Sequence, residues 1–412
     1  MHSSLLKLSK SHRFHPRVVK LISSDLTKNE MKSTNIVCPP SVEFGLRLIG
    51  VWPGTSHAFL RRIFYILLMM MFQVFQYQYV IMHFGEEDLL VLIDVLSATL
   101  AYSILLIKLI IFALNVRLLD EMIASMVKDW NTRDVSDDHT MTKMAYISRR
   151  FSNLIIACNA TSVVFYATGT LLRHRSGNQT DARELLLIME LPFTIDNASV
   201  YVAILVTQFI HQTSAASMAG VLDCLLITLV LHVSGQIDLV RQKLSEISQK
   251  DIERHIAENI IKTLIVRHQN IIIFSKNIEA LFSNIALMQF VSNTLVICCL
   301  GFLIVISFGA PNGSTMLVKS LVFYLVINTE AFILCFVGEH LSKKSKMIGD
   351  AAYESLWYNL TPTQNRDVLF IIVRSQKHLT LTVGKIMDLS LKQFTAIVKA
   401  SASYVSVLHA MY

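Results

Sequence analysis

The sequence predicts an all-α membrane protein with seven transmembrane helices, a cytoplasmic N-terminus, an extracellular C-terminus and long helices that extend into an intracellular bundle. Of its 412 residues, 53% are hydrophobic and only 16% are charged, whereas soluble proteins average about 25% charged residues. Several apolar stretches reach the length of about 20 residues that a helix needs to cross a bilayer. A soluble multidomain protein is therefore excluded. The net charge of +7 is scattered between apolar segments, so no nucleic-acid partner is expected.

Seven apolar windows divide the chain. They cover about Ile63 to Met82, Leu89 to Leu114, Phe151 to Leu172, Tyr201 to Val233, Ile285 to Phe308, Met316 to Val337 and Leu389 to Met411. Residues 1–62 hold no apolar run long enough for a signal peptide, so the first window is expected to insert directly. A mitochondrial transit peptide is the less favoured interpretation of this basic N-terminal segment.

The basic residues predict the orientation of these helices. Lys and Arg number 10 in residues 1–62, 6 in 115–150, 7 in 235–282 and 6 in 338–384, whereas the alternate connecting segments hold 3. Cytoplasmic segments carry the excess of Lys and Arg, which places the N-terminus inside. The glycosylation sequons at Asn178 and Asn312 fall in segments that this count places outside.

The fourth and fifth windows lie in unusually long helical stretches. Residues 197–234 are long enough for a hairpin, but His211 to Ser217, where it would turn, contain no Pro, Gly or charged residue, so we expect one long helix. Isoleucines at a helical period lead from Ile252 to Ile285 without interruption, and a further short helix is expected after Pro362. The expected organisation has four parts: a cytoplasmic segment (1–62), helices one to six with cytosolic extensions (63–337), a cytoplasmic segment with a short helix (338–384) and the seventh helix (385–412).

No motif of an enzyme, metal site or cofactor is present, so neither catalysis nor a cofactor is expected. The six cysteines predict no disulfide framework. Ionisable residues within the windows are functional candidates. Lys108 and Lys319 lie near span ends and can extend to the interface, whereas Glu330 and Lys399 lie deeper and are candidates for an ion pair.

Aromatic and polar residues mix in the external halves of several windows, which is typical of a pocket for a small apolar ligand, although the same pattern also describes ordinary helix packing. Gln208 and His211, one helical turn apart, could bind a polar group of a ligand or bond within the bundle.

Three stretches resemble insect odorant receptors. They are Leu46-Arg-Leu-Ile-Gly-Val-Trp-Pro53, then Leu229-Val-Leu-His-Val233 with Gly235-Gln-Ile-Asp238, and a C-terminal series that includes Gly338-Glu-His-Leu341, Ala352-Tyr-Glu-Ser-Leu-Trp-Tyr358, Leu381-Thr-Val-Gly-Lys385 and Ser403-Tyr-Val-Ser-Val-Leu408. The order and spacing of these motifs are similar to those of the family, especially its hymenopteran branch.

The resemblance implies an odorant-gated, non-selective cation channel in the plasma membrane of a sensory neuron dendrite. The chain would be the odorant-binding subunit of a tetramer with an obligate co-receptor, because it lacks the co-receptor's long insertion in the second cytosolic loop. A small volatile ligand would bind between spans two, three, four and six. The candidate ligand-binding residues are Ser97, Ala101, Phe165, Thr168, Tyr201, Leu205, Gln208, Tyr324 and Ile327.

The seventh span is the expected pore helix. Val407 and Met411 lie four residues apart on one helix face, and an apolar ring can close a pore by dewetting. By resemblance, the matching co-receptor positions line its constriction, and Ala410 replaces a pore-lining Gln. The alternatives are a homomeric gustatory-type channel, a G-protein-coupled receptor, whose N-terminus would face outward, and a transporter, whose broken helices are not seen here.

Overall fold

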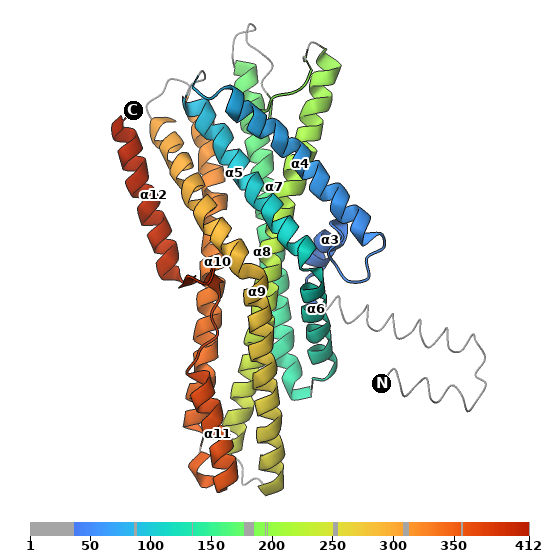
Figure 1. Cartoon of the computed structure of the whole chain (residues 1–412), viewed down its shortest axis with the longest axis vertical. Coiled ribbons are helices and arrows are strands. Elements are labelled where there is room, and N and C mark those ends of the chain that lie inside the picture. Colours follow the sequence, from blue (N-terminus) through green and yellow to red (C-terminus); the bar gives the residue numbers. More distant parts are fainter. Residues whose placement is uncertain are drawn as a thin grey trace, which may run out of the picture.

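Four long helices run along the long axis of the molecule (Figure 1): α7 (Val135–Ser176), α8 (Ala198–Gln249), α9 (Arg254–Ser307) and α10 (Ser314–Glu354). The computed structural model describes residues 37–85, 89–133, 135–176, 185–193, 195, 197–249, 254–307, 313–355 and 357–411. At 1.5 Å per residue, helices of this length span roughly 60 to 80 Å, about twice the hydrocarbon thickness or more. The predictions of one unbroken fourth helix and of an uninterrupted lead into the fifth are confirmed.

Three further helices stand only beside the upper halves of these four in Figure 1: α4 (Ala58–Met82), α5 (Leu89–Leu114) and α12 (Leu391–Met411). We call this part the apolar half. Among the described residues, six helices are long and apolar enough to cross a membrane, namely α4, α5, α7, α8, α9 and α10. The seventh predicted span corresponds to α12, which is less apolar because it carries Lys392, Lys399 and several hydroxyl groups. α12 nevertheless lies against α9 and α10 within the same half.

The other end of the molecule is a bundle that we call the distal bundle. It contains α6 (Val116–Asn131), α11 (Pro362–Ser375), the short 3₁₀ helix η1 (Trp357–Asn359) and the lower halves of α7 to α10 (Figure 1). Its interior is apolar, with Leu244, Leu264 and Ile348 fully buried. α11 begins as predicted at Pro362, and Thr361 with Gln364 forms a capping box at its start.

A turn at Gly50 joins helix α3 (Pro40–Leu48) to α4. Gly50 has φ +69°, and a Cβ at this position would lie 2.2 Å from the carbonyl oxygen of Ala58. Arg62 donates a 2.9 Å hydrogen bond to the Gly50 carbonyl, while Val51 and Trp52 are buried. The motif around residues 46–53 therefore builds a tight corner, which explains its Gly.

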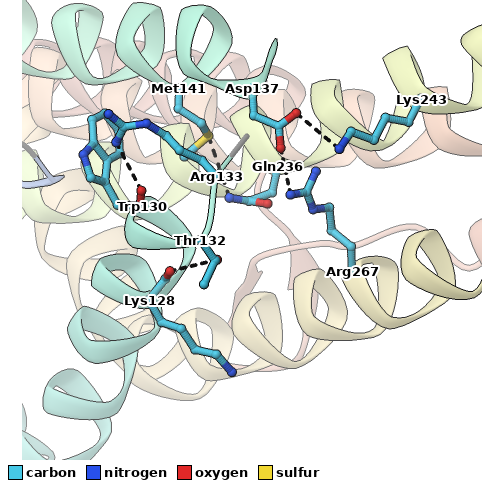
Figure 2. A network of polar contacts seen from close by, with 9 residues as sticks. All are labelled: Lys128, Trp130, Thr132, Arg133, Asp137, Met141, Gln236, Lys243 and Arg267. Carbon is cyan, nitrogen blue, oxygen red and sulfur yellow. Dashed lines mark hydrogen bonds and ion pairs between the residues drawn. The ribbon is translucent and has the colours of Figure 1, made fainter. Parts of the chain in front are cut away.

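A buried carboxylate ties the start of α7 to two other helices. Asp137 is 1% exposed and accepts a 2.9 Å hydrogen bond from Arg267 of α9, and it forms a 3.4 Å ion pair with Lys243 of α8. Figure 2 shows both cations converging on Asp137. Arg133, which precedes α7, stacks its guanidinium 4.1 Å from the Trp130 ring. These contacts hold the α6–α7 corner against the distal bundle.

A two-stranded hairpin connects α11 to α12. Strands β1 (Thr382–Val383) and β2 (Met387–Asp388) pair antiparallel across a three-residue loop, 384–386, in which Gly384 and Lys385 both have positive φ. The Ile386 amide donates a 3.0 Å hydrogen bond to the Val383 carbonyl and closes the turn. Gly384 donates a hydrogen bond to the Ser283 carbonyl of α9. The first turn of α12 is held by α10, because the Leu391 amide donates to Glu339 at 2.7 Å.

Helices α3 and α6 and the hairpin were not predicted from the sequence. The sequons at Asn178 and Asn312 lie outside the described residues, so their glycosylation stays a prediction, as does the division of the chain into four parts.

Candidate functional site

A cavity of about 130 Å³ lies inside the apolar half, between α5, α7, α8 and α10, with one wall residue from α9. Alanines supply much of the space, because α8 presents them at a helical spacing in place of larger side chains. Aromatic and aliphatic groups complete the apolar wall. These lining residues are Ala98, Ala101, Tyr102, Ile104, Leu105, Val163, Tyr166, Leu187, Ala215, Ala216, Ala219, Val322, Phe323, Val326 and Ile327.

Polar groups also line this cavity. They are Lys108, Asn159, Ser162, Gln212, Asn293 and Glu330. Lys108 donates a 2.9 Å hydrogen bond to Asp223 of α8, and Glu330 accepts one of 3.1 Å from Gln289 of α9.

These contacts correct two expectations. Glu330 does not pair with Lys399, which is exposed on α12, because α9 supplies its partner. Lys108 does not extend to the interface either, because Asp223 holds it in the interior.

A second ion pair lies beside the wall residue Tyr166. Lys319 of α10 lies 2.5 Å from Asp94 of α5 and 4.5 Å from the centre of the Tyr166 ring. We expected Lys319 to extend to the membrane interface, but its ammonium group forms the ion pair with Asp94 instead. A cation over an aromatic face is stabilised by the ring quadrupole, so this pair fixes Tyr166 in the cavity wall.

Gln208 and His211 stabilise the bundle rather than the cavity wall. The Gln208 amide donates to the Leu187 carbonyl at 2.9 Å and accepts from the Leu187 amide at 3.2 Å. His211 stacks on Phe72 of α4, with ring centroids 3.8 Å apart. Gln208 therefore holds the segment that precedes α8 over the cavity, where Leu187 forms part of the wall.

Two of the nine candidate ligand-binding residues, Ala101 and Ile327, line the cavity. Phe165 and Thr168 are exposed on α7, and Ser97 is fully buried beside the wall residue Ala98. The others do not line it either: Tyr201, Leu205, Gln208 and Tyr324. The predicted helices agree with those that form the cavity, but the predicted helix faces differ.

The polar wall residues of α8 and α9 were not predicted from the sequence. Among the described residues, Gln212 Oε1 and Asn293 Nδ2 are buried without a hydrogen-bond partner. The sequence did contain a signal for them, because burying an Asn or a Gln within a long apolar run costs free energy unless its polar atoms are hydrogen-bonded.

The predicted gate residues lie near the far end of α12. Val407 is 55% exposed and Ala410 is also exposed, whereas Val405 faces α9 at Gly301, where a Cβ would meet it at 2.8 Å. The side chain of Met411 lies outside the described residues. One face of α12 is thus exposed within the described chain.

Comparison with known proteins identifies the family. The sequence model of the 7tm odorant receptor family matches residues 88–402. The chain belongs to this family. This odorant receptor is 26% identical to Odorant receptor 13a of Drosophila melanogaster over 63% of its own length and 65% of that protein. It is 22% identical to Odorant receptor 22c of Drosophila melanogaster over 88% and 94% of the two chains.

Solved structures share the fold of this odorant receptor. The olfactory receptor OR5 from Machilis hrabei, in complex with eugenol, superposes with a TM-score of 0.75 at 12% identity, covering 90% of this chain and 97% of that one. A second structure of the same receptor gives a TM-score of 0.72 at 15% identity. The fold described above is therefore shared with this solved receptor.

Proposed function

We propose that this odorant receptor is the odorant-binding subunit of a heteromeric cation channel that opens when a small, mostly apolar volatile binds. The cavity between α5, α7, α8 and α10 carries this proposal. It lies within helices that can cross a membrane, and most of its wall is hydrocarbon, as in other small-molecule sites. OR5, which shares the fold, was solved in complex with eugenol.

The partner is an obligate co-receptor subunit, and the distal bundle offers a surface for it. Leu369, Phe370 and Val373 of α11 are 45%, 63% and 56% exposed. Apolar side chains grouped on one helix are typical of an interface that another chain covers. Assembly through α11 would also bring several copies of α12 around one axis, where their free faces can line a pore.

Recordings from cells that express this chain with a co-receptor test the proposal. We expect odorant-evoked cation currents that are absent when either subunit is omitted, with the receptor in the plasma membrane, as in a sensory dendrite. Currents from this chain alone would favour the homomeric alternative, and responses that require a G protein would overturn the channel.

A matched pair of substitutions tests the cavity. Ala216 lines the cavity, so Ala216→Phe should fill it and abolish responses. Ala203, on the same helix, is exposed and lies outside the wall, so Ala203→Phe should leave odorant potency unchanged. Equal loss of response in both variants at normal surface expression would place the binding site elsewhere.

A further inference from the structure

One end of the cavity carries an acceptor of hydrogen bonds. Lys108 and Glu330 both line it, but the Lys108 ammonium is bound to Asp223. Glu330 receives a neutral N–H from Gln289. Two carboxylates thus share one ammonium at this end. The Glu330 carboxylate remains a strong acceptor, which is costly to bury without donors.

A hydrogen-bond donor lies one helical turn along α9 from Gln289, the partner of this carboxylate. Asn293 lines the cavity and is 3% exposed, and within the described chain its Nδ2 has no hydrogen-bond partner. Asn293 is four residues from Gln289 on α9. Residues at this spacing are neighbours on one helix face, with Cβ atoms about 5 to 6 Å apart. The unpartnered N–H group and the Glu330 carboxylate therefore belong to the same end of the cavity.

We propose that the cavity selects small alcohols or phenols, and that their hydroxyl group donates to Glu330 and accepts from Asn293. Only a group that both donates and accepts satisfies both residues. An ether accepts but cannot donate, an ammonium donates but cannot accept, and an alkane does neither. The inference rests on the proposed function, because it names the ligand class of the same cavity.

The remaining wall fits the apolar body of such a ligand. Besides Glu330 and Asn293, the wall includes the α8 alanines, Tyr166 and Phe323. Gln212, the other wall residue with an unpartnered atom, precedes Asp223 by three helical turns, or roughly 16 Å along α8. It therefore lies away from the Lys108–Asp223 pair and does not compete for the hydroxyl group.

Binding to the purified full-length receptor tests the proposal independently of channel opening. Thermostabilisation by four probes of equal heavy-atom count is compared: 1-hexanol, 1-methoxypentane, hexylamine and heptane. We expect 1-hexanol to bind about tenfold or more tightly than the ether and the alkane, since a hydrogen bond to a charged group supplies that difference. Equal or tighter binding of the ether or the alkane, or no binding of the alcohol, would overturn the proposal.

Substitutions of Asn293 and Glu330 test which residues produce the preference. Asn293→Leu should remove most of the advantage of the alcohol over the alkane. Asn293→Asp keeps the shape of the side chain but removes the donor, so it should have the same effect. This second variant serves if the Leu variant does not fold. Ser292→Ala is the matched control, because Ser292 is also buried with an unpartnered oxygen but lies outside the wall. Glu330→Gln should reduce the preference by weakening the acceptor. An alcohol preference unchanged by both Asn293 variants contradicts the assignment.

Different results would refute the proposed channel function and the proposed ligand class. Alcohol binding without currents in the presence of a co-receptor would refute the channel function and leave the ligand class standing. Currents evoked by esters or alkanes, with no preference for alcohols in either assay, would retain the channel and refute the ligand class.

Discussion

Asp137 is the residue on which the α6–α7 corner depends. Asp137→Asn would leave Arg267 and Lys243 without their shared carboxylate (Figure 2). Removing one partner of a buried charge network costs more than the network contributes, because the remaining charges stay desolvated. We expect a loss of about 2 to 3 kcal/mol, measured as thermal stability of the receptor in detergent.

Asp138 provides the control for this prediction. Its side chain is 49% exposed and pairs with Arg133 at 2.6 Å. Exposed pairs contribute at most about 1 kcal/mol, so Asp138→Asn should change stability little. A similar loss in both variants would mean that burial of Asp137 does not determine the effect.

His268 makes the distal bundle sensitive to acid. Burial, with a smaller effect from the Arg374 charge, lowers the pKa of His268 to about 4, below the ordinary value of about 6.5. Between these values the unfolded chain binds a proton that the folded chain resists, so stability falls as pH drops through this window, by up to about 1.4 kcal/mol per pH unit.

Above pH 6.5 the contribution of His268 is constant, because the imidazole is neutral in both states. Melting temperatures measured from about pH 7.5 to pH 4.5 check the prediction. His268→Leu should be less sensitive to pH in the lower part of this range than the natural chain. An unchanged pH profile in this variant would exclude His268 as the source.

Residue positions in the cavity were the least predictable part of the site. Each residue turns a helix by about 100°, so an error of one position moves a side chain from the wall into the bundle, as with Ser97 and Ala98. The Lys108–Asp223 pair joins residues 115 apart in sequence. Sequence alone gives the depth of each charge but not which helices pack together.

At the scale of elements, apolar length determined what could be predicted. The second window, Leu89 to Leu114, coincides with α5, because the apolar run ends sharply at both sides. α3 and α6 were missed because they are short and amphipathic, with no long apolar run. The hairpin before α12 was missed because each strand has only two residues.

The free face of α12 leads to a prediction about the closed channel. Val407 is exposed, whereas Val405 packs toward Gly301 of α9. If α12 lines the pore, Val407→Ser should hydrate an apolar constriction and raise the resting leak or alter cation permeability ratios of the mixed channel. Ala410→Gln and Met411→Ser should act in the same direction.

Val405→Ser is the matched control for the pore, since it changes the same residue type two positions away on the face toward α9. It should not alter permeability ratios in well-expressed channels. Unchanged leak, permeability and blocker sensitivity in the Val407, Ala410 and Met411 variants would show that α12 does not line the conducting path.

At the scale of the whole molecule, the orientation in the membrane is the main prediction. The counts of 29 and 3 basic residues on the two sides predict that the distal bundle and the N-terminus lie in the cytosol. An epitope at Met1 should be labelled only after permeabilisation, and one after Tyr412 should be labelled on intact cells. The opposite pattern would contradict the proposed channel.

The hairpin anchors one end of α12. Its lower end is fixed, because the Gly384 amide binds α9 and the Leu391 amide binds α10, whereas its far end carries the exposed Val407. A small rotation of α12 about this anchored end produces a larger displacement at the far end, about 30 Å along the helix. A tilt of about 5° would move the far end by roughly 2.5 Å while the hairpin remained in place. This displacement is comparable with the radius of a pore that admits a small ion. Small repacking between α9 and α10 could therefore change the width of a pore at the opposite end of α12.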